Sequence, residues 1–213
     1  MASDYGAVIM NQKSPSRSTG RPSRDRAVLI DGTIVNATLD AFIEHGIEFS
    51  MDGVAQSAGI SKQAIYRRWP SKIELLAHAI DAHSDFQRRF LTADLPTDPL
   101  EALREFLWRR FDIDESKKNR LNIFLQAAAL RNEELRARLI QWRGFSIAMI
   151  HERIEQVMLA RPTADCDTRA LAELISEMLV AASTSRAWLG SGEASRKTTF
   201  EQRWKAICTL LQA

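Results

Sequence analysis

A short polar stretch in the first third of the chain carries side chains that can contact DNA. Gln63 can form two hydrogen bonds to an adenine edge, and Arg67 can do the same with N7 and O6 of guanine. Lys62, Tyr66 and Lys72 are suited to phosphate oxygens, whose contacts fix the register of a protein on DNA without reading its sequence. These residue types at this spacing predict a helix that enters a DNA groove.

Two short helices joined by a tight turn must position these side chains. Ser50 is expected to cap the first helix, Gly59 to end it with a positive φ, and Ser61 to cap the second. The first helix has one apolar face, formed by Met51, Val54, Ala55 and Ala58. Ser71 with Glu74 forms a capping box for the helix that follows. The pattern predicts a helix-turn-helix motif.

The free N–H groups at the starts of these helices extend the set of candidate DNA contacts, because helix N-termini attract phosphate. The candidate DNA-binding residues are Ser50, Met51, Ser61, Lys62, Gln63, Tyr66, Arg67 and Lys72. Four basic residues and no acidic residue lie between positions 61 and 72. The alternative interpretation is a basic helix face that contacts only solvent.

The segment from Ala27 to Leu76 resembles the DNA-binding domain of the TetR (tetracycline-repressor) family of bacterial regulators. The matching positions are Phe42, Gly46, Ala58, Gly59, Ser61, Tyr66, Trp69, Ser71 and Lys72. The chain departs from the family pattern at Trp69, where Phe or Tyr is more usual. It departs again at Gly53, which should cost about 1 kcal/mol relative to alanine inside a helix. The resemblance implies that the second helix of the turn lies in the major groove.

The composition fits a regulator that has one basic surface. The chain has 213 residues and a formal net charge of only +2, so positive charge is concentrated rather than spread over the molecule. Two cysteines, Cys166 and Cys208, do not suggest a disulfide scaffold, and a reduced, cytoplasmic chain is expected. No apolar run approaches the ~18 residues of a membrane span, so no membrane association is expected.

The periodicity of the apolar residues predicts an all-α chain of about nine helices. Residues 1–22 are expected to form a disordered basic tail, residues 23–76 a three-helix helix-turn-helix DNA-binding domain, and residues 77–213 a larger helical ligand-binding and dimerisation domain. Beyond the turn, helices are expected from residue 71 and over 100–114, 120–130, 133–160, 165–189 and 195–211.

The larger domain is rich in aromatic side chains that could line a pocket between helices. The candidate ligand-binding residues are Phe124, Trp142, Phe145, Met149 and Met178, and the effector is expected to be a largely apolar small molecule. Gln126, Arg143 or Ser146 could set the polarity of such a pocket. The alternative is that aromatic residues at helical spacing only form the core.

Family members pair through a four-helix bundle, so the resemblance implies a homodimer formed by the last two helices. Two-fold pairing would place two recognition helices on a palindromic operator in double-stranded DNA. Apolar stripes on these helices are compatible with pairing, at Leu171, Leu174, Ile175, Met178, Leu179, Ala182, Trp204, Ile207 and Leu211.

Signatures of an enzyme are absent from the sequence. It has no glycine-rich phosphate loop, no nucleophile elbow and no Cys-x-x-Cys pair, and its four histidines lack the spacing of metal ligands. No catalytic residue, metal site or cofactor is therefore expected. A ligand-responsive repressor is the favoured function, and the alternatives are an activator of the same family or a helical protein-interaction module.

The N-terminal tail offers a first test, because residues 1–26 contain five basic and two acidic residues. If the basic residues of the tail contact DNA, as arginines in a minor groove do, deletion of residues 1–20, which removes Lys13 and Arg17, should weaken DNA binding. The plot of log affinity against log salt should also become shallower, by about one unit for each phosphate that the tail neutralises. Fluorescence anisotropy across a salt series measures this slope, and an unchanged slope would instead indicate a solubilising tail.

Overall fold

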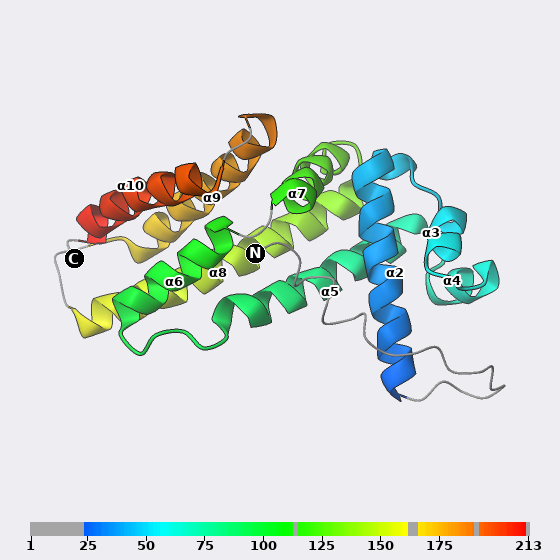
Figure 1. Cartoon of the computed structure of the whole chain (residues 1–213), viewed down its shortest axis with the longest axis horizontal. Coiled ribbons are helices and arrows are strands. Elements are labelled where there is room, and N and C mark those ends of the chain that lie inside the picture. Colours follow the sequence, from blue (N-terminus) through cyan, green and yellow to red (C-terminus); the bar gives the residue numbers. More distant parts are fainter. Residues whose placement is uncertain (1–23, 113–114, 162–165, 190–191, 212–213) are drawn as a thin grey trace.

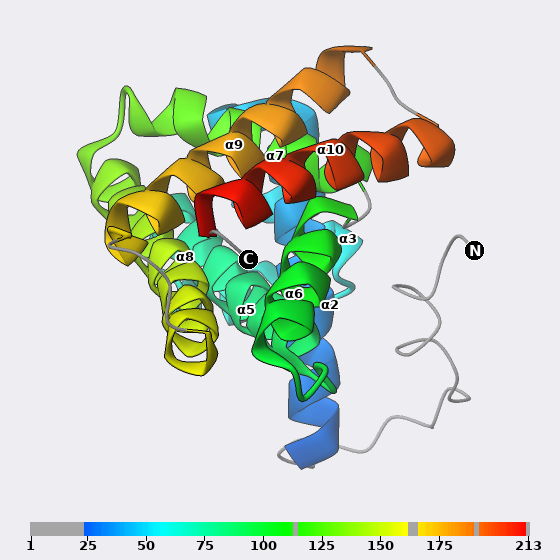
Figure 2. The same cartoon turned by 90° about the vertical axis from the view of Figure 1, so that its left-hand side faces the viewer.

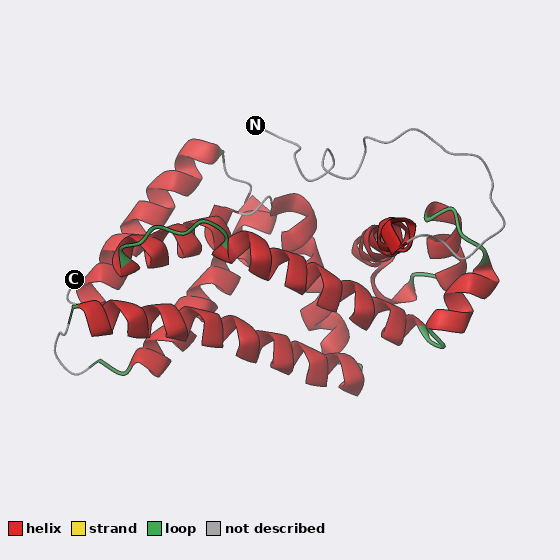
Figure 3. Cartoon of the chain, turned by 90° about the horizontal axis from the view of Figure 1, so that it is seen from below, coloured by secondary structure: helices red, strands yellow, loops and turns green. Residues whose placement is uncertain are grey.

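A computed structural model describes residues 24–112, 115–161, 166–189 and 192–211. Within these ranges every regular element is a helix (Figure 3). The head contains α2 (Arg24–His45), the 3-10 turn η1 (Gly46–Glu48), α3 (Met51–Ser57) and α4 (Lys62–Arg68). The larger part contains α5 (Lys72–Thr92), α6 (Pro99–Asp112), α7 (Glu115–Ala129), α8 (Glu133–Ala160), α9 (Thr168–Leu189) and α10 (Glu193–Leu211). The predicted all-α class is confirmed, and the described ranges hold nine α-helices.

The predicted helix boundaries agree with the structure to within two residues except at the starts of α9, which begins at Thr168 rather than at 165, and of α7. This helix begins at Glu115, five residues before the predicted start at position 120. Its first turn is Glu-Ser-Lys-Lys-Asn, which has no apolar side chain to reveal a helical period. The predicted tail, residues 1–22, lies outside the described residues, so its disorder stays a prediction.

The turns of the head are set by three serine caps. The Oγ atoms of Ser50, Ser61 and Ser71 accept hydrogen bonds from backbone N–H groups three residues later, at 3.0–3.2 Å. Each cap satisfies one of the N–H groups that a helix start leaves unpaired. Gly59 adopts φ +66° between α3 and α4, as predicted for the residue that ends the first helix of the turn.

The structure gives a local reason for a glycine at position 53, which the sequence pattern did not show. A Cβ atom at this position would lie 3.0 Å from Ser50 Oγ, the capping atom of the same helix. Alanine would therefore crowd the cap of α3, which opposes the gain in helix propensity expected from replacing glycine.

Two hydrophobic cores organise the chain. The head core is built around Phe42, Phe49, Val54 and Ile65, which are all at most 2% exposed. The larger core joins α6, α8, α9 and α10 through fully buried side chains such as Phe106. Figure 1 shows the head at one end of an elongated molecule, and Figure 2 shows α9 and α10 on the side of the larger part away from α5.

Helix α5 belongs to both cores. Its first turns place Leu75, Leu76 and Ile80 in the head core, and its last turns place Leu91 in the larger core. Helices α7 and α8 close the junction, where Phe124 meets Phe42 edge to face with ring centroids 6.4 Å apart. The predicted boundary between residues 76 and 77 falls inside α5, and it stays a prediction.

No helix in the described part of the chain has the length and hydropathy needed to cross a membrane.

The packing of the head predicts a sharp contrast between two phenylalanines. Phe42→Ala should lower the free energy of unfolding by about 3–5 kcal/mol, because the side chain is fully buried among large apolar neighbours. Phe90→Ala should cost less than about 1 kcal/mol, since Phe90 is 45% exposed. Urea unfolding followed by circular dichroism measures both values, and equal losses would contradict this packing.

Candidate nucleic-acid interface and small-molecule cavity

Helix α4 has one buried face and one polar face. Ile65 is completely buried in the head core. Gln63, Tyr66 and Arg67 are exposed on the opposite side, and half of the surface of Tyr66 is accessible. The helix therefore presents donors and a positive charge outward while its apolar side holds it to the head.

Lys62 is occupied by a contact inside the helix-turn-helix. Its Nζ donates a hydrogen bond to Asp52 of α3 at 2.5 Å. The hydrogen bond from Lys62 is the main cause that lowers the pKa of Asp52, and the same bond raises the pKa of Lys62. Tyr66 also contributes to the lowered pKa of Asp52. Lys62 thus fastens α4 to α3, and a phosphate would have to compete with Asp52 for it.

Two other basic residues of the predicted cluster also hold the motif together. Arg68 donates to Asp31 of α2 at 2.8 Å and lies over the Trp69 ring at 4.5 Å. Lys72 donates to the carbonyl oxygen of Ile47 at 2.6 Å, which ties the start of α5 to η1. By contrast, Gln63 and Arg67 form no hydrogen bond or ion pair with other described residues.

The remaining candidate DNA contacts lie at helix N-termini. Ser50 and Ser61 are exposed, but their Oγ atoms serve as caps. The Met51 side chain is 7% exposed and packs in the head core. Only its backbone N–H, in the first turn of α3, is suited to a phosphate contact. The DNA contacts of all eight predicted residues stay predictions.

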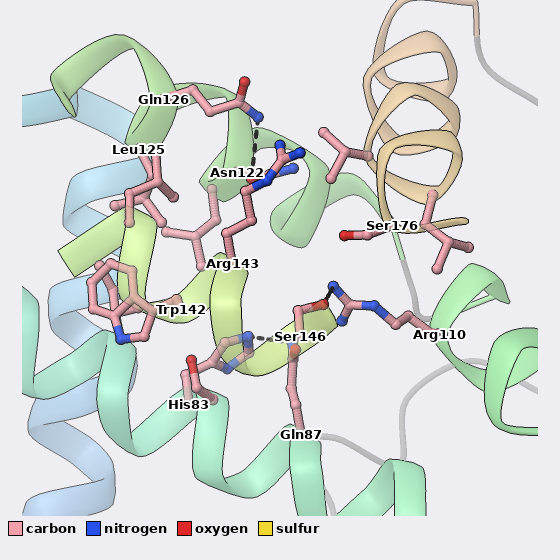
Figure 4. Close-up of a pocket in the computed structure, with 16 residues that line it drawn as sticks. His83, Gln87, Arg110, Asn122, Leu125, Gln126, Trp142, Arg143, Ser146 and Ser176 are labelled. Atoms are coloured by element: carbon pink, nitrogen blue, oxygen red, sulfur yellow. Dashed lines mark hydrogen bonds between the residues drawn. The ribbon is translucent and has the colours of Figure 1, made fainter. Parts of the chain in front are cut away.

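A cavity of about 290 Å³ lies between α5, α7, α8 and α9, with one side chain entering from α6 (Figure 4). Its apolar wall consists of Ile80, Leu121, Leu125, Leu139, Trp142, Leu179 and Val180. Its polar wall consists of His83, Ser84, Gln87, Arg110, Asn122, Gln126, Arg143, Ser146 and Ser176. This mixture suits a small ligand that has an apolar body and a few polar groups.

A second cavity of about 500 Å³ adjoins the first and has Phe106, Phe145 and Met149 among its apolar lining. The two cavities share five lining residues, which are Ser84, Gln87, Arg110, Trp142 and Ser146. The shared wall therefore carries four of the nine polar residues of the first cavity, Arg110 among them.

The five predicted ligand-binding residues fall in different places. Trp142 lines both cavities, while Phe145 and Met149 line the second. Phe124 packs against the head core and Met178 against the core of the larger part, and neither lines a cavity. The polar candidates Gln126, Arg143 and Ser146 all line the first cavity.

Arg110 lines both cavities and was missed by the sequence analysis. Its Nη2 donates to Ser146 Oγ at 2.8 Å, as Figure 4 shows. Its Nε is buried without a hydrogen-bond partner, and no carboxylate of the described residues pairs with it. Burial lowers the pKa of Arg110, but a guanidinium remains charged in proteins. One signal in the sequence could have pointed to Arg110. It is a charged residue placed at helical spacing from the apolar residues Leu103, Phe106 and Leu107, so it lies on the same face of α6.

Helix α5 connects the cavity to the head. Its Asp81 accepts hydrogen bonds from Trp142 Nε1 at 2.7 Å and from Arg138 at 3.3 Å, both on α8. Two and six residues after Asp81 on the same helix, His83 and Gln87 lie on the cavity wall with their Nε2 atoms 2.6 Å apart. A ligand that moves these groups would act on the helix whose first turns complete the head core.

Comparisons with known proteins place the head in a described family. Residues 34–79 match the family model for bacterial regulatory proteins of the tetR family. A 68-residue segment is 44% identical to the DNA-binding transcriptional repressor TetR of Mycobacteroides abscessus. That match covers 30% of this chain and 36% of the relative, so the alignment spans about a third of the relative's length.

Solved structures of similar fold extend the likeness beyond the head. GusR of Salmonella enterica superposes with a TM-score of 0.69 at 19% identity, over 86% of this chain and 96% of its own. A TetR transcription regulator from Haloarcula marismortui also has a TM-score of 0.69 at 19% identity, over 84% of this chain and 95% of its own. At this identity the likeness concerns the fold.

The uncompensated charge of Arg110 predicts a stabilising substitution. Arg110→Met should raise the free energy of unfolding of the ligand-free protein by about 1 kcal/mol, because it replaces a partly buried guanidinium, whose Nε has no hydrogen-bond partner, by an apolar chain of similar length. Urea unfolding measures the change.

Arg109→Met is the matched control on the same helix. Arg109 pairs with Glu105 and donates to two backbone carbonyl groups, of Phe90 and Ala93. Its loss should therefore cost about 1–2 kcal/mol. A loss of similar size in Arg110→Met would mean that Arg110 is compensated by another group.

Proposed function

Because the chain belongs to the TetR family of bacterial regulatory proteins, we propose that it is a DNA-binding transcriptional repressor that a small molecule releases from its operator. The observation that carries this proposal is the double role of α5. The same helix completes the core of the DNA-binding head and forms a wall of the cavity.

The exposed face of α4 supports a division of labour on DNA. Gln63 and Arg67 have no intramolecular partner in the described part of the chain, so no internal contact must break before they read base edges in the major groove. Lys62, Tyr66 and Lys72 would contact phosphates together with Ser50, Met51 and Ser61 at the helix starts. The internal contacts of Lys62 and Arg68 orient the reading helix in advance.

In a homodimer, the two copies of α4 (the reading helices) would contact one operator. Two-fold pairing places them about one DNA turn apart, roughly 34–36 Å, on a palindromic site. Most of the predicted stripe on α9 and α10 packs inside the protomer, including Leu171, Ile175 and Trp204. Leu174 and Leu210 are about half exposed on the same helices, and they are suited to the centre of a dimer interface.

The switch requires two arrangements of α5. A ligand in the cavity would bind one arrangement more tightly than the other, since only differential affinity shifts a conformational equilibrium. The arrangement with ligand would hold the heads at a spacing that fits the operator poorly. Linkage then requires that DNA lowers the affinity for ligand by the same factor by which ligand lowers the affinity for DNA. Repression is preferred over activation, because occupying a promoter needs no further contact with polymerase.

Substitutions on α4 test the DNA-binding surface. An operator is first selected from random duplexes with the wild-type protein, and affinity is then measured by fluorescence anisotropy. Arg67→Ala and Tyr66→Ala should abolish detectable specific binding, since the first removes a base contact worth about 1–3 kcal/mol per half-site and the second removes a phosphate contact that fixes the register on DNA. Both variants should keep the wild-type circular dichroism spectrum and sedimentation coefficient, because both side chains are exposed.

Arg136→Ala supplies the control for loss of one positive charge. Arg136 lies on the exposed side of α8, paired with Glu133, and its removal should leave operator affinity unchanged. Wild-type affinity in the α4 variants, or equal losses in all three proteins, would contradict the proposal.

A further inference from the structure

We propose that the first cavity takes an organic carboxylate, whose negative charge pairs with Arg110 and whose apolar body fills the space between α5, α7, α8 and α9. The inference rests on the proposed function, because it assigns a chemical class to the small molecule that the repressor would sense.

The Arg110 guanidinium carries an uncompensated charge in the described part of the chain. A buried ion is costly unless a partner of opposite charge and hydrogen bonds offset the loss of water. In the described structure Arg110 has one hydrogen bond, to the neutral Ser146 hydroxyl, and a buried Nε without a partner. A carboxylate is the natural missing partner, because its two oxygens match the planar donor fork of a guanidinium.

The charges around the two cavities differ. Among the described residues that line the first cavity there are two arginines, Arg110 and Arg143, and no aspartate or glutamate. Arg143 is already paired with Glu177 at 2.8 Å. The second cavity is lined by Asp85 and Glu152 as well as by Arg88 and Arg110, and Asp85 is paired with Arg88, so its charges are balanced. Of the two cavities, the first therefore has the more positive described lining and is the better site for an anionic ligand.

Neutral hydrogen-bonding groups share the cavity wall with Arg110. Gln87, only 9% exposed, and Ser146 both lie on the wall shared by the two cavities. A carboxylate accepts up to about four hydrogen bonds, so an amide and a hydroxyl beside the guanidinium can complete its coordination. Trp142, Leu125 and Leu179 add apolar surface to the lining. At about 290 Å³ the space is at the small end for ligand pockets, which suits a medium-chain or arylalkyl acid.

The test compares charged and uncharged probes on the full-length protein without DNA. Isothermal titration calorimetry is performed with octanoate and 4-phenylbutyrate, and with the methyl ester of each acid. The acids should bind wild type at least about tenfold more tightly than their esters, since charged hydrogen bonds contribute about twice as much as neutral ones. Arg110→Gln should weaken acid binding by about 10–100-fold and leave ester binding unchanged.

Arg136→Gln is the matched control variant, because it also removes one positive charge from the larger part but lies outside both cavities. Its affinity for the acids should equal that of wild type. The comparison of acid with ester needs only the wild-type protein, so it decides the question even if Arg110→Gln fails to fold.

Three results would overturn the inference: equal binding of acid and ester, acid binding that survives Arg110→Gln, or no binding of either acid at millimolar concentration. Anisotropy with the selected operator then separates the inference from the proposed function. Acid binding that depends on Arg110 but leaves operator affinity unchanged would support the carboxylate site and contradict release of DNA by such a ligand.

Discussion

The burial of α5 in two hydrophobic cores is the constraint on which the rest of the structure depends. Leu75, Leu76 and Ile80 are nearly inaccessible in the head, and Leu91 is nearly inaccessible in the larger part. Close-packed interiors do not deform continuously. A shift of this helix in one core must therefore be accompanied by a change of packing in the other core. The helix that carries the cavity wall is therefore mechanically joined to the helix-turn-helix head.

The electrostatic contacts of the head set orientation more than stability. Lys62 pairs with Asp52 and Arg68 with Asp31, both at exposed or half-exposed positions, where ion pairs contribute only about 0–1 kcal/mol. Their geometric effect is larger, because they join α4 to α3 and α2 and leave Gln63 and Arg67 facing outward. An interface that is ordered before binding loses less conformational entropy when its partner arrives.

The larger part combines a well-packed core with a polar wall that reduces its stability. Gln87 and Ser176 are buried polar residues, and the Nε atom of Arg110 is buried without a hydrogen-bond partner. Residues that lower stability without improving the packing are most often found at functional sites, which is why the cavity is the part of the larger domain on which the proposed ligand site rests.

The sequence by itself determined the helical class, nearly all helix boundaries and the turn of the head, because caps, glycines and apolar periodicity are local signals. Ser50, Gly59 and Ser61 have the roles that their types predict.

Only the tertiary structure decided which of the candidate side chains share a cavity. Trp142 lines it and Phe124 does not, although both are aromatic residues on helices of the same part. The cavity wall is assembled from five successive helices, α5 to α9. Periodicity along one helix carries no information about which neighbour its face will meet. The pairing of Lys62 with Asp52 and the isolation of Arg110 were decided in the same way, because the partner of a charge depends on the packing of whole helices.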